Sequence, residues 1–287
     1  MKQNRFRISI VGAGNMAFRL GIALRDAGHD ICAVWSRRRD AGEKLTSILS
    51  SEGGSTRYTE DLADLIDSQI IILAVSDNAI NELASRLAAI LRVGQHASLP
   101  LTIHTSGATD ISALAPLAEI GAPCGVLWPM MTLSKNKNIQ FNEAPLLIEC
   151  PDRRTRETLE AVAYSLRCEY FHCDSARRLQ MHCAAVFASN FTNYALSLAY
   201  ELAGDKAPYL IPTAIEAVRK CCIFHPDQVQ TGPALRGDTA TMERHIHLLH
   251  EMGLTEHEEI YKIISKNIPH RIKKDNTWPT IKQNFTR

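Results

Sequence analysis

Short apolar runs alternate with amphipathic segments over the first 173 residues. Each apolar run is four to six residues long, as expected for a buried strand. The runs are Phe6–Val11, Ile31–Ser36, Ile70–Val75, Leu101–Thr105, Gly125–Trp128, Pro145–Glu149 and Glu169–His172. Apolar residues at helical spacing lie between the first of them, over Met16–Ala27, Arg38–Leu49 and Asn78–Leu91. This alternation predicts a doubly wound α/β domain, in which helices cover both faces of a parallel sheet.

The pattern becomes purely helical after Asp174. Residues Ser175 to Leu202 form one long alanine-rich helical pattern that contains neither proline nor glycine. Three further helical stretches follow, at Tyr209–Cys222, Thr239–Met252 and Thr255–Asn267. We therefore expect an α/β fold with a Rossmann-type parallel sheet, followed by an all-α second domain. The predicted domains are a dinucleotide-binding domain over residues 1–173, a helical substrate or dimerisation domain over 174–268 and a polar C-terminal extension over 269–287.

A glycine-rich turn follows the first predicted strand. It has the form G-x-G-x-x-A and lies between a hydrophobic strand and an amphipathic helix. Gly12 permits the tight turn, Gly14 lets the backbone approach a pyrophosphate, and Ala17 allows close packing of helix on strand. The N-terminus of the helix favours an anion. The turn predicts a dinucleotide site made by Gly12, Ala13, Gly14, Asn15 and Met16, and the alternative is a Rossmann fold that has lost its ligand.

The end of the second predicted strand indicates which dinucleotide binds. NAD enzymes usually place a carboxylate there to hold the ribose hydroxyls. Here the strand ends at Ser36, no carboxylate follows before Asp40, and Asp30 precedes the strand. A serine with adjacent guanidinium groups suits a 2′-phosphate, so Ser36, Arg37 and Arg38 predict NADP(H). The alternative is a solvated start to the next helix.

Residues that follow the next two strands should border the same crevice, because ligands of such sheets bind outside the carboxyl ends of the strands. The first group is expected on the adenosine side and the second near the nicotinamide. The residues are Ala74, Val75, Ser76, His104 and Thr105 for the cofactor and Ser106 for the substrate.

The long predicted helix carries polar side chains on an otherwise apolar face. His182, Val186 and Asn190 are spaced i, i+4 and i+8 and share that face, and Asn193 is close to it. Polar groups in such a place need partners, and a histidine can donate a proton near neutral pH. We assign His182 and Asn190 to catalysis and Asn193 to substrate binding. The alternative is a core histidine with two asparagines that join helices.

A turn between the later helices carries a second candidate group. Asp238 is well placed to cap the helix that begins at Thr239, and this role alone explains it. No structural role of this kind explains Arg236. A guanidinium at a domain cleft commonly holds a carboxylate or phosphate. We assign both to substrate binding. The sequence His245-x-His247-x-x-His250 indicates surface histidines rather than a metal site, because a helix directs the first two about 200° apart.

Composition narrows the possible partners. Lys and Arg total 32 against 31 Asp and Glu, so the net charge of +1 offers no footprint for nucleic acid or an anionic membrane. No apolar run approaches the roughly 18 residues of a membrane helix, and Ile8–Val11 is too short for a signal peptide. The eight cysteines form no C-x-x-C pair, which favours reduced core thiols in a cytoplasmic protein over a disulfide framework or a zinc site.

Four motifs resemble one known family. They are Val11-Gly-Ala-Gly-Asn-Met-Ala17, His104-Thr-Ser-Gly107, Val186-Phe-Ala-Ser-Asn-Phe-Thr-Asn193 and Gly232-Pro-Ala-Leu-Arg-Gly-Asp238. The whole chain resembles the Rossmann-like family with a C-terminal helical domain of unknown function, whose members are described as NADP oxidoreductases. It is more distantly similar to pyrroline-5-carboxylate reductase, the deazaflavin-dependent NADP oxidoreductases and the β-hydroxyacid dehydrogenases. The resemblance implies a fold and a cofactor class, and no established substrate.

One position departs from the β-hydroxyacid dehydrogenases. That family uses a lysine four residues before an asparagine on the corresponding helix, where this chain has Val186 before Asn190, and residues 175–203 contain no lysine. Hydroxyacid chemistry with a lysine acid is therefore not expected, and His182 is a possible replacement.

Two classes of function follow from the sequence. The first is an NADP(H)-dependent oxidoreductase that reduces a small carbonyl or imine substrate bearing a carboxylate. His182 would donate the proton, Asn190 and Ser106 would position the reacting group, and Arg236 would hold the carboxylate. The second is a non-catalytic NADP(H)-binding sensor or assembly protein. A homodimer through the helical domain is also expected, because the long helix has more apolar surface than short helices cover.

Overall fold

The computed structural model describes residues 5–51, 54–94, 98–131 and 141–271. Two compact units make up the chain, Met1–Phe191 and Thr192–Arg287. Their division falls 18 residues after the predicted domain boundary at residues 173 and 174, because the helical segment that precedes Thr192 packs with the sheet. Of the predicted C-terminal extension over residues 269–287, residues 269–271 instead form the end of a helix, Thr255–Arg271, and the rest lies outside the described residues.

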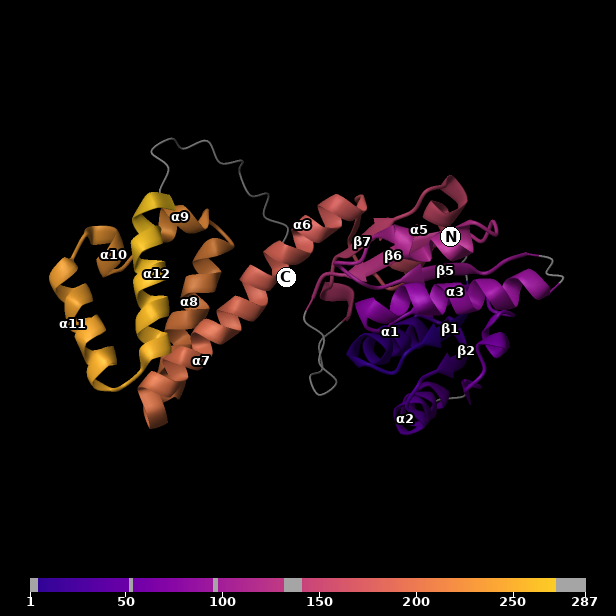
Figure 1. Ribbon diagram of the computed structural model, residues 1–287, viewed down its shortest axis with the longest axis horizontal. Helices are drawn as coiled ribbons and strands as arrows, with labels where there is room; N and C mark the ends of the chain where they lie inside the picture. The colour runs from indigo at the N-terminus through magenta and orange to yellow at the C-terminus, as the bar shows by residue number, and fades with distance from the viewer. Residues whose placement is uncertain (1–4, 52–53, 95–97, 132–140, 272–287) are drawn as a thin grey trace. The chain divides into compact units, whose positions relative to one another are not determined.

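The first unit is built on an eight-stranded sheet (Figure 1) with the strand order β3-β2-β1-β4-β5-β6-β7-β8. The strands are β1 (Arg7–Val11), β2 (Asp30–Trp35), β3 (Arg57–Thr59), β4 (Ile70–Leu73), β5 (Leu101–His104), β6 (Cys124–Pro129), β7 (Leu146–Glu149) and β8 (Tyr170–His172). The prediction of a Rossmann-type fold is confirmed. One detail was wrong, because β7 runs antiparallel to β6 and the sheet is therefore only mostly parallel.

Helices cover both faces of this sheet. The helices α1 (Asn15–Asp26), α2 (Arg39–Ser50) and α5 (Arg153–Ser165) pack against one face, and α3 (Asp77–Val93) with α4 (Ala115–Ala118) packs against the other. Alternate residues of each strand supply the two cores; in β1, for example, Ile8 and Ile10 face one core and Val11 faces the other. The strand order reverses between β1 and β4, which is where a doubly wound sheet opens a crevice for a ligand.

Strand β3 and helix α5 are among the elements of the first unit that were not predicted. Strand β3 has three residues, of which only Thr59 is buried, so it leaves almost no hydrophobic pattern. Helix α5 does carry a pattern, since Leu159, Val162 and Ala163 are buried at helical spacing. It also has a capping residue, because the Asp152 carboxylate accepts a hydrogen bond from the Thr155 N–H at 2.9 Å.

The predicted helix over residues 175–202 is present, but not as a uniform α-helix. It consists of α6 (Ser175–Ala185), a π-helical segment η4 (Val186–Phe191) and α7 (Thr192–Ala203). A π-helical turn contains more residues than an α-helical turn, so it changes which side chains share a face. Such turns are frequent at functional sites, and this one contains Asn190.

The second unit is entirely helical within its described residues. After α7 it contains η5 (Gly204–Leu210), α8 (Ile211–Cys221), α9 (Pro226–Val229), α10 (Pro233–Arg236), α11 (Thr239–Glu251) and α12 (Thr255–Arg271). An all-α second part was predicted, and the starts of α11 and α12 match the sequence pattern. None of the described helices has both the length and the apolar character needed to cross a membrane.

The cysteines are only partly core residues. Cys124 and Cys168 are buried, and burial raises the pKa of each thiol to about 11. Cys183 and Cys222 are exposed, and the other four are intermediate. The prediction of core thiols therefore holds for the first two alone.

A buried ion pair anchors α6 to the sheet. The Arg178 side chain is 1% exposed, and its guanidinium pairs with the Glu149 carboxylate at the end of β7. It also donates to the Thr109 carbonyl oxygen in the loop that follows β5. Ser175 strengthens the same junction, because it donates to Glu149 at 2.9 Å and accepts from the Ile111 N–H at 3.0 Å. This cluster joins α6, β7 and the loop after β5.

We expect the substitution Glu149→Ala to lower the free energy of unfolding by about 3–5 kcal/mol, because it leaves the buried Arg178 charge without its partner. The matched control is Glu157→Ala, which breaks an exposed ion pair with Arg153 on α5 and should cost less than about 1 kcal/mol. Guanidinium-induced unfolding followed by circular dichroism measures both. Equal losses in the two variants would contradict the anchoring role.

Candidate functional site

The glycine-rich turn lies where β1 meets α1. Gly12 has a φ of +120°, a conformation that favours glycine, and a Cβ atom there would overlap the Ala74 carbonyl oxygen. The turn therefore passes directly against the end of β4. At Gly14 the opposite holds, because an added Cβ would meet no protein atom within 4 Å. Gly14 thus borders open space, as a backbone that approaches a ligand should.

A cleft of about 650 Å³ opens over this turn. Its wall includes most of the residues that the sequence assigned to the cofactor: Gly12, Ala13, Gly14, Asn15, Met16, Ser36, Arg37, Arg38, Ala74, Val75 and Ser76. Helix α1 begins in the cleft, with Gly14 as its N-cap and no side chain capping it. A helix N-terminus beside a glycine turn fits a diphosphate. The residues present therefore fit a dinucleotide, and their part in binding it stays a prediction.

Three consecutive arginines follow β2, and they differ in their partners. Arg39 is paired with Glu43 at 2.8 Å and lies 3.6 Å from Glu60, and these carboxylates raise the pKa of its guanidinium. The side chains of Arg37 and Arg38, by contrast, have no ion-pair or hydrogen-bond partner among the described residues, and both line the cleft. Two uncompensated cations therefore border the cleft at the carboxyl end of β2.

The other two predicted cofactor residues do not line the cleft. His104 is fully buried at the end of β5 and Thr105 is nearly so. The His104 Nδ1 accepts a hydrogen bond from the Ser106 N–H at 3.2 Å, so the neutral ring carries its proton on Nε2. Burial, and then the nearby Arg178 charge, lower the pKa of His104 to about 4, so the ring is neutral near pH 7. Because His104 is buried and accepts the bond from the Ser106 N–H, we infer that it supports the loop after β5 and does not line the cleft.

That loop carries Ser106 and Gly107. The Ser106 hydroxyl accepts hydrogen bonds from the Ala108 and Thr109 N–H groups at 3.1 and 2.9 Å, and the residue is 8% exposed. Its substrate-binding role stays a prediction. At Gly107 an added Cβ would lie 2.5 Å from the His182 ring and 2.6 Å from the Trp128 ring. The loop after β5 therefore packs directly against His182.

A second cavity, of about 570 Å³, is lined by residues of the end of β6, of α6 and of the π-helical segment η4. His182 and Asn190 both line it, together with Val186, and the His182 ring packs on Trp128 with 5.5 Å between the ring centroids. No described residue hydrogen-bonds to the His182 ring or to the Asn190 side chain. The remaining wall residues are Met130, Met131, Met181, Ala184, Ala185, Ala188 and Ser189.

The other predicted substrate residues belong to the second unit. Asp238 caps α11 as predicted, accepting a hydrogen bond from the Thr241 N–H at 3.0 Å, and this bond lowers the pKa of its carboxyl group. Arg236 is exposed at the end of α10, and Asn193 is exposed near the start of α7. Their part in a substrate site stays a prediction. His245, His247 and His250 are exposed, which confirms that they are surface histidines.

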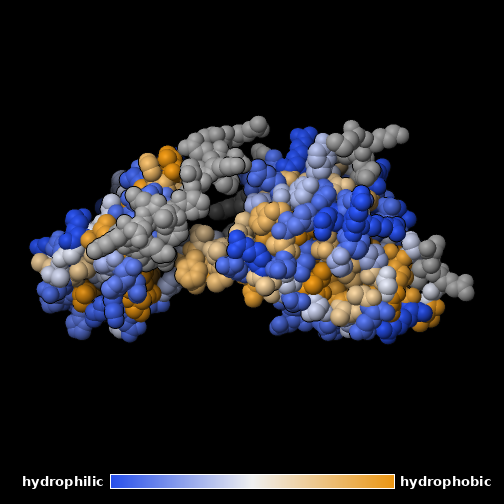
Figure 2. Space-filling model, turned by 90° about the horizontal axis from the view of Figure 1, so that it is seen from above, coloured by the Kyte–Doolittle hydropathy of each residue, from blue (hydrophilic) through white to orange (hydrophobic). Residues whose placement is uncertain are grey.

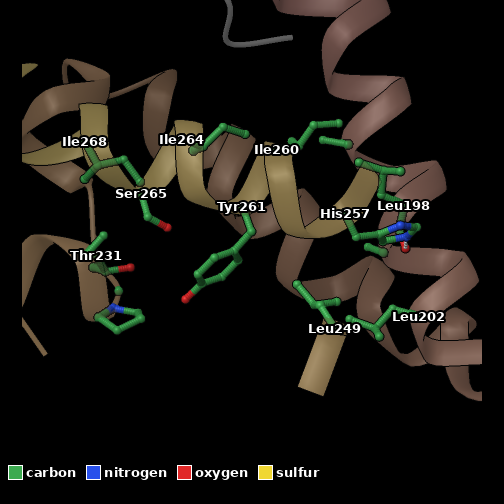
Figure 3. Close-up of a pocket in the computed structure, with 15 residues that line it drawn as sticks. Leu198, Leu202, Thr231, Leu249, His257, Ile260, Tyr261, Ile264, Ser265 and Ile268 are labelled. Atoms are coloured by element: carbon green, nitrogen blue, oxygen red, sulfur yellow. Dashed lines mark hydrogen bonds between the residues drawn. The ribbon is translucent and has the colours of Figure 1, made fainter. Parts of the chain in front are cut away.

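An apolar pocket of about 340 Å³ lies within the second unit (Figure 3). Leu198 and Leu202 of α7, Leu249 of α11 and the isoleucines of α12 line it. Two of its polar side chains already have partners: the His257 Nε2 donates to the Leu198 carbonyl at 3.1 Å, and the Tyr261 hydroxyl bonds to His245 at 2.9 Å. A catalytic site is therefore better supported in the first unit, where the His182 ring and the Asn190 side chain have no hydrogen-bond partner among the described residues.

Comparisons with known proteins give the family. Residues 1–129 match the description "Rossmann-like domain", and residues 144–268 match "Domain of unknown function (DUF2520)". A crystal structure of a "putative NADP oxidoreductase" from Bacteroides fragilis is 30% identical, with 93% of this chain and 99% of that chain covered and a TM-score of 0.79. The chain belongs to this Rossmann-like, DUF2520-containing family. No match was found among curated proteins.

More distant structures share the fold. An imine reductase from Myxococcus stipitatus in complex with NAD+ is 19% identical, with 96% and 97% of the two chains covered and a TM-score of 0.61. A pyrroline-5-carboxylate reductase from Coxiella burnetii is 16% identical, with 95% and 100% covered and a TM-score of 0.54. At these identities the likeness shows the fold alone. Together with the family match, it supports the broad class of nicotinamide-dependent oxidoreductases.

Some residues of both sites were missed from the sequence. Trp35 and four residues of α3, namely Ala79, Glu82, Leu83 and Arg86, line the cleft. The α3 residues are spaced i, i+3, i+4 and i+7, so they share a helix face that a search beyond strand ends would have found. Trp128 lies at the carboxyl end of a predicted strand, and the same rule that selected Ala74 would have selected it.

Proposed function

We propose that the protein is an NADP(H)-dependent oxidoreductase that reduces a small carbonyl or imine compound. The observation that carries the proposal is the pair of uncompensated guanidinium groups, Arg37 and Arg38, in a cleft built on a glycine turn. An enzyme that used NAD would more usually present a carboxylate at this place. A 2′-phosphate would give both cations a partner through charge-assisted hydrogen bonds.

The order of the strands supports a reaction site near β6, where the nicotinamide and the proton donor would meet. The glycine turn would hold the diphosphate, and the arginines after β2 would hold the adenosine end on one side of it. The nicotinamide would then extend the other way, past the ends of β4 and β5, in the direction of β6, which carries Trp128. His182 packs against Trp128 and against the loop after β5, so it is the proton donor that the geometry favours.

In the proposed reduction the cofactor and the residues of the chain have different roles. NADPH, when bound, supplies the hydride. The His182 ring, which no described residue engages by a hydrogen bond, would give a proton to the oxygen or nitrogen of the reacting group. Asn190 would orient that group from the same cavity, and Trp128 with the methionines would exclude water. A carboxylate on the substrate depends on Arg236 and stays a prediction.

We also propose that two copies associate through the second unit. Helices α7 and α8 contain no buried residue, although both are rich in apolar side chains. Their exposed hydrophobic residues include Tyr194, Tyr200, Leu202, Ile215 and Val218, and hydrophobic side chains are visible at the surface in Figure 2. A helix whose apolar side chains remain uncovered gains little stability from its own unit, so a partner is needed to cover them.

The cofactor assignment is tested by calorimetric titration with NADPH and NADH. Arg37→Ala/Arg38→Ala should weaken NADPH binding by at least about tenfold, because each charged hydrogen bond contributes roughly 1.5–3 kcal/mol, and should leave NADH binding nearly unchanged. Arg39→Ala is the matched control, since Arg39 is already paired with Glu43 and Glu60. Equal binding of both nucleotides by the wild type would contradict NADP preference. Binding of neither would make the glycine turn a remnant of the fold.

The proton donor is tested with a panel of ketones, keto acids and cyclic imines, followed by the loss of NADPH fluorescence. His182→Ala should lower kcat by about 10²–10⁴-fold, which is the usual contribution of a general acid, and should leave NADPH affinity within a factor of two or so. His225→Ala in the second unit serves as the control. Full turnover by the His182 variant would remove it as the acid, whereas NADPH binding without turnover of any compound would favour a nucleotide sensor.

The dimer is tested by light scattering. We expect a mass twice the 31.9 kDa of one chain over a broad concentration range. Ile215→Glu/Val218→Glu, which places charges on the exposed face of α8, should shift the mass toward one chain without loss of helical circular dichroism. A single-chain mass for the wild type at every concentration would contradict the association.

A further inference from the structure

Arg86 lies in the cleft of the first unit and was not expected there. It belongs to α3, and it lines the cleft with Ala79, Glu82 and Leu83 of the same helix. Its guanidinium lies over the indole of Trp35, with Cζ 5.6 Å from the ring centroid. Trp35 is the last residue of β2 and directly precedes Ser36. Arg86 therefore borders the cleft beside the end of β2, as Arg37 and Arg38 do, but it comes from α3 rather than from the loop after β2.

The indole beneath Arg86 is firmly held. Trp35 is 6% exposed, and its Nε1 donates to the Glu60 carbonyl at 3.0 Å. The carboxylate of Glu82, in contrast, is 4.0 Å from the Arg86 guanidinium, and both side chains are at least half exposed. An exposed pair at that separation contributes little. The aromatic face, rather than the carboxylate, is therefore the main support of the guanidinium.

This arrangement gives a planar cation on an apolar base. Leu83 and Ala79 of the same helix add apolar side chains to the lining, and Arg37 and Arg38 line the cleft from the loop after β2. A flat aromatic ring of purine size, with polar edges, is the ligand group that such a wall fits, because guanidinium planes stack on nucleobases. A phosphate would be held less well here, since Glu82 lines the same stretch of the wall.

We propose that Arg86, supported by Trp35, is an adenine-binding residue whose guanidinium stacks on the base of the nucleotide. This inference rests on the proposed use of NADP(H). It assigns two different tasks to the arginines of the cleft. Arg37 and Arg38 distinguish NADP from NAD through the 2′-phosphate, whereas Arg86 contributes equally to both nucleotides because both contain adenine.

The test is a calorimetric titration of the full chain with NADPH, NADH and 5′-AMP. Arg86→Ala should weaken the binding of all three by about tenfold, with an unchanged ratio between NADPH and NADH. Arg92→Ala is the matched control: it removes another exposed arginine of α3, paired with Glu119 at 3.8 Å and outside the cleft, and should change nothing. Arg86→Lys, which keeps the charge and loses the plane, should behave nearly like Arg86→Ala.

A second readout comes from tryptophan emission. Binding of 5′-AMP, which lacks the nicotinamide, should change the emission of Trp35, and Trp35→Phe should abolish that change. If Arg86→Ala weakens NADPH alone, the residue binds the 2′-phosphate and the stacking role is wrong. If all affinities match the wild type, Arg86 has no role in binding. A wild type that binds no nucleotide would overturn the cofactor assignment itself, which separates that failure from a failure at Arg86.

Discussion

The buried charge of Arg178 is the interaction on which the arrangement of the first unit depends. A guanidinium removed from water must keep its partners, and here they come from three places: the Glu149 carboxylate at the end of β7, the Thr109 carbonyl after β5 and Ser175 within α6. The helix cannot slide along the sheet without leaving one of them unpaired. His182 follows Arg178 by one helical turn, so the same constraint sets the position of the proposed acid.

Charged side chains are distributed unevenly between the cleft over the glycine turn and the cavity that His182 lines. The turn at Gly12 and Gly14 offers backbone and a helix end, and no cationic side chain. The cations gather beside the end of β2, where Arg39 is neutralised by its carboxylates and Arg37 and Arg38 are not. Around the second cavity the wall is mainly alanine, methionine and tryptophan, with His182 as its one titratable group among the described residues. Recognition of the nucleotide and transfer of a proton to the substrate would therefore take place in different electrostatic surroundings.

Most of the fold could be predicted because buried parallel strands leave continuous apolar runs and their helices leave a periodic pattern. The short β3 could not, since one buried residue forms no pattern, and the direction of β7 depends on a connection that composition does not encode. The cleft residues at strand ends followed from topology. Arg86 did not, because it lies within α3 rather than at a strand end, and its contact with Trp35 joins positions 51 residues apart. The π-helical segment has no recognised sequence pattern. Sequence periodicity also placed Asn193 close to the helix face that carries His182, although the two residues belong to different compact units.

The contact between Gly107 and His182 has a practical consequence for protein engineering. Any side chain at position 107 would displace the His182 imidazole or the Trp128 indole, so most members of a mutant library that included this position would have His182 out of place. Met130, Met131 and Met181 border the same cavity with unbranched, adaptable side chains. Randomising those three positions while holding 107 as glycine would change the size and shape of the cavity, and the geometry of the proposed proton donor would be preserved.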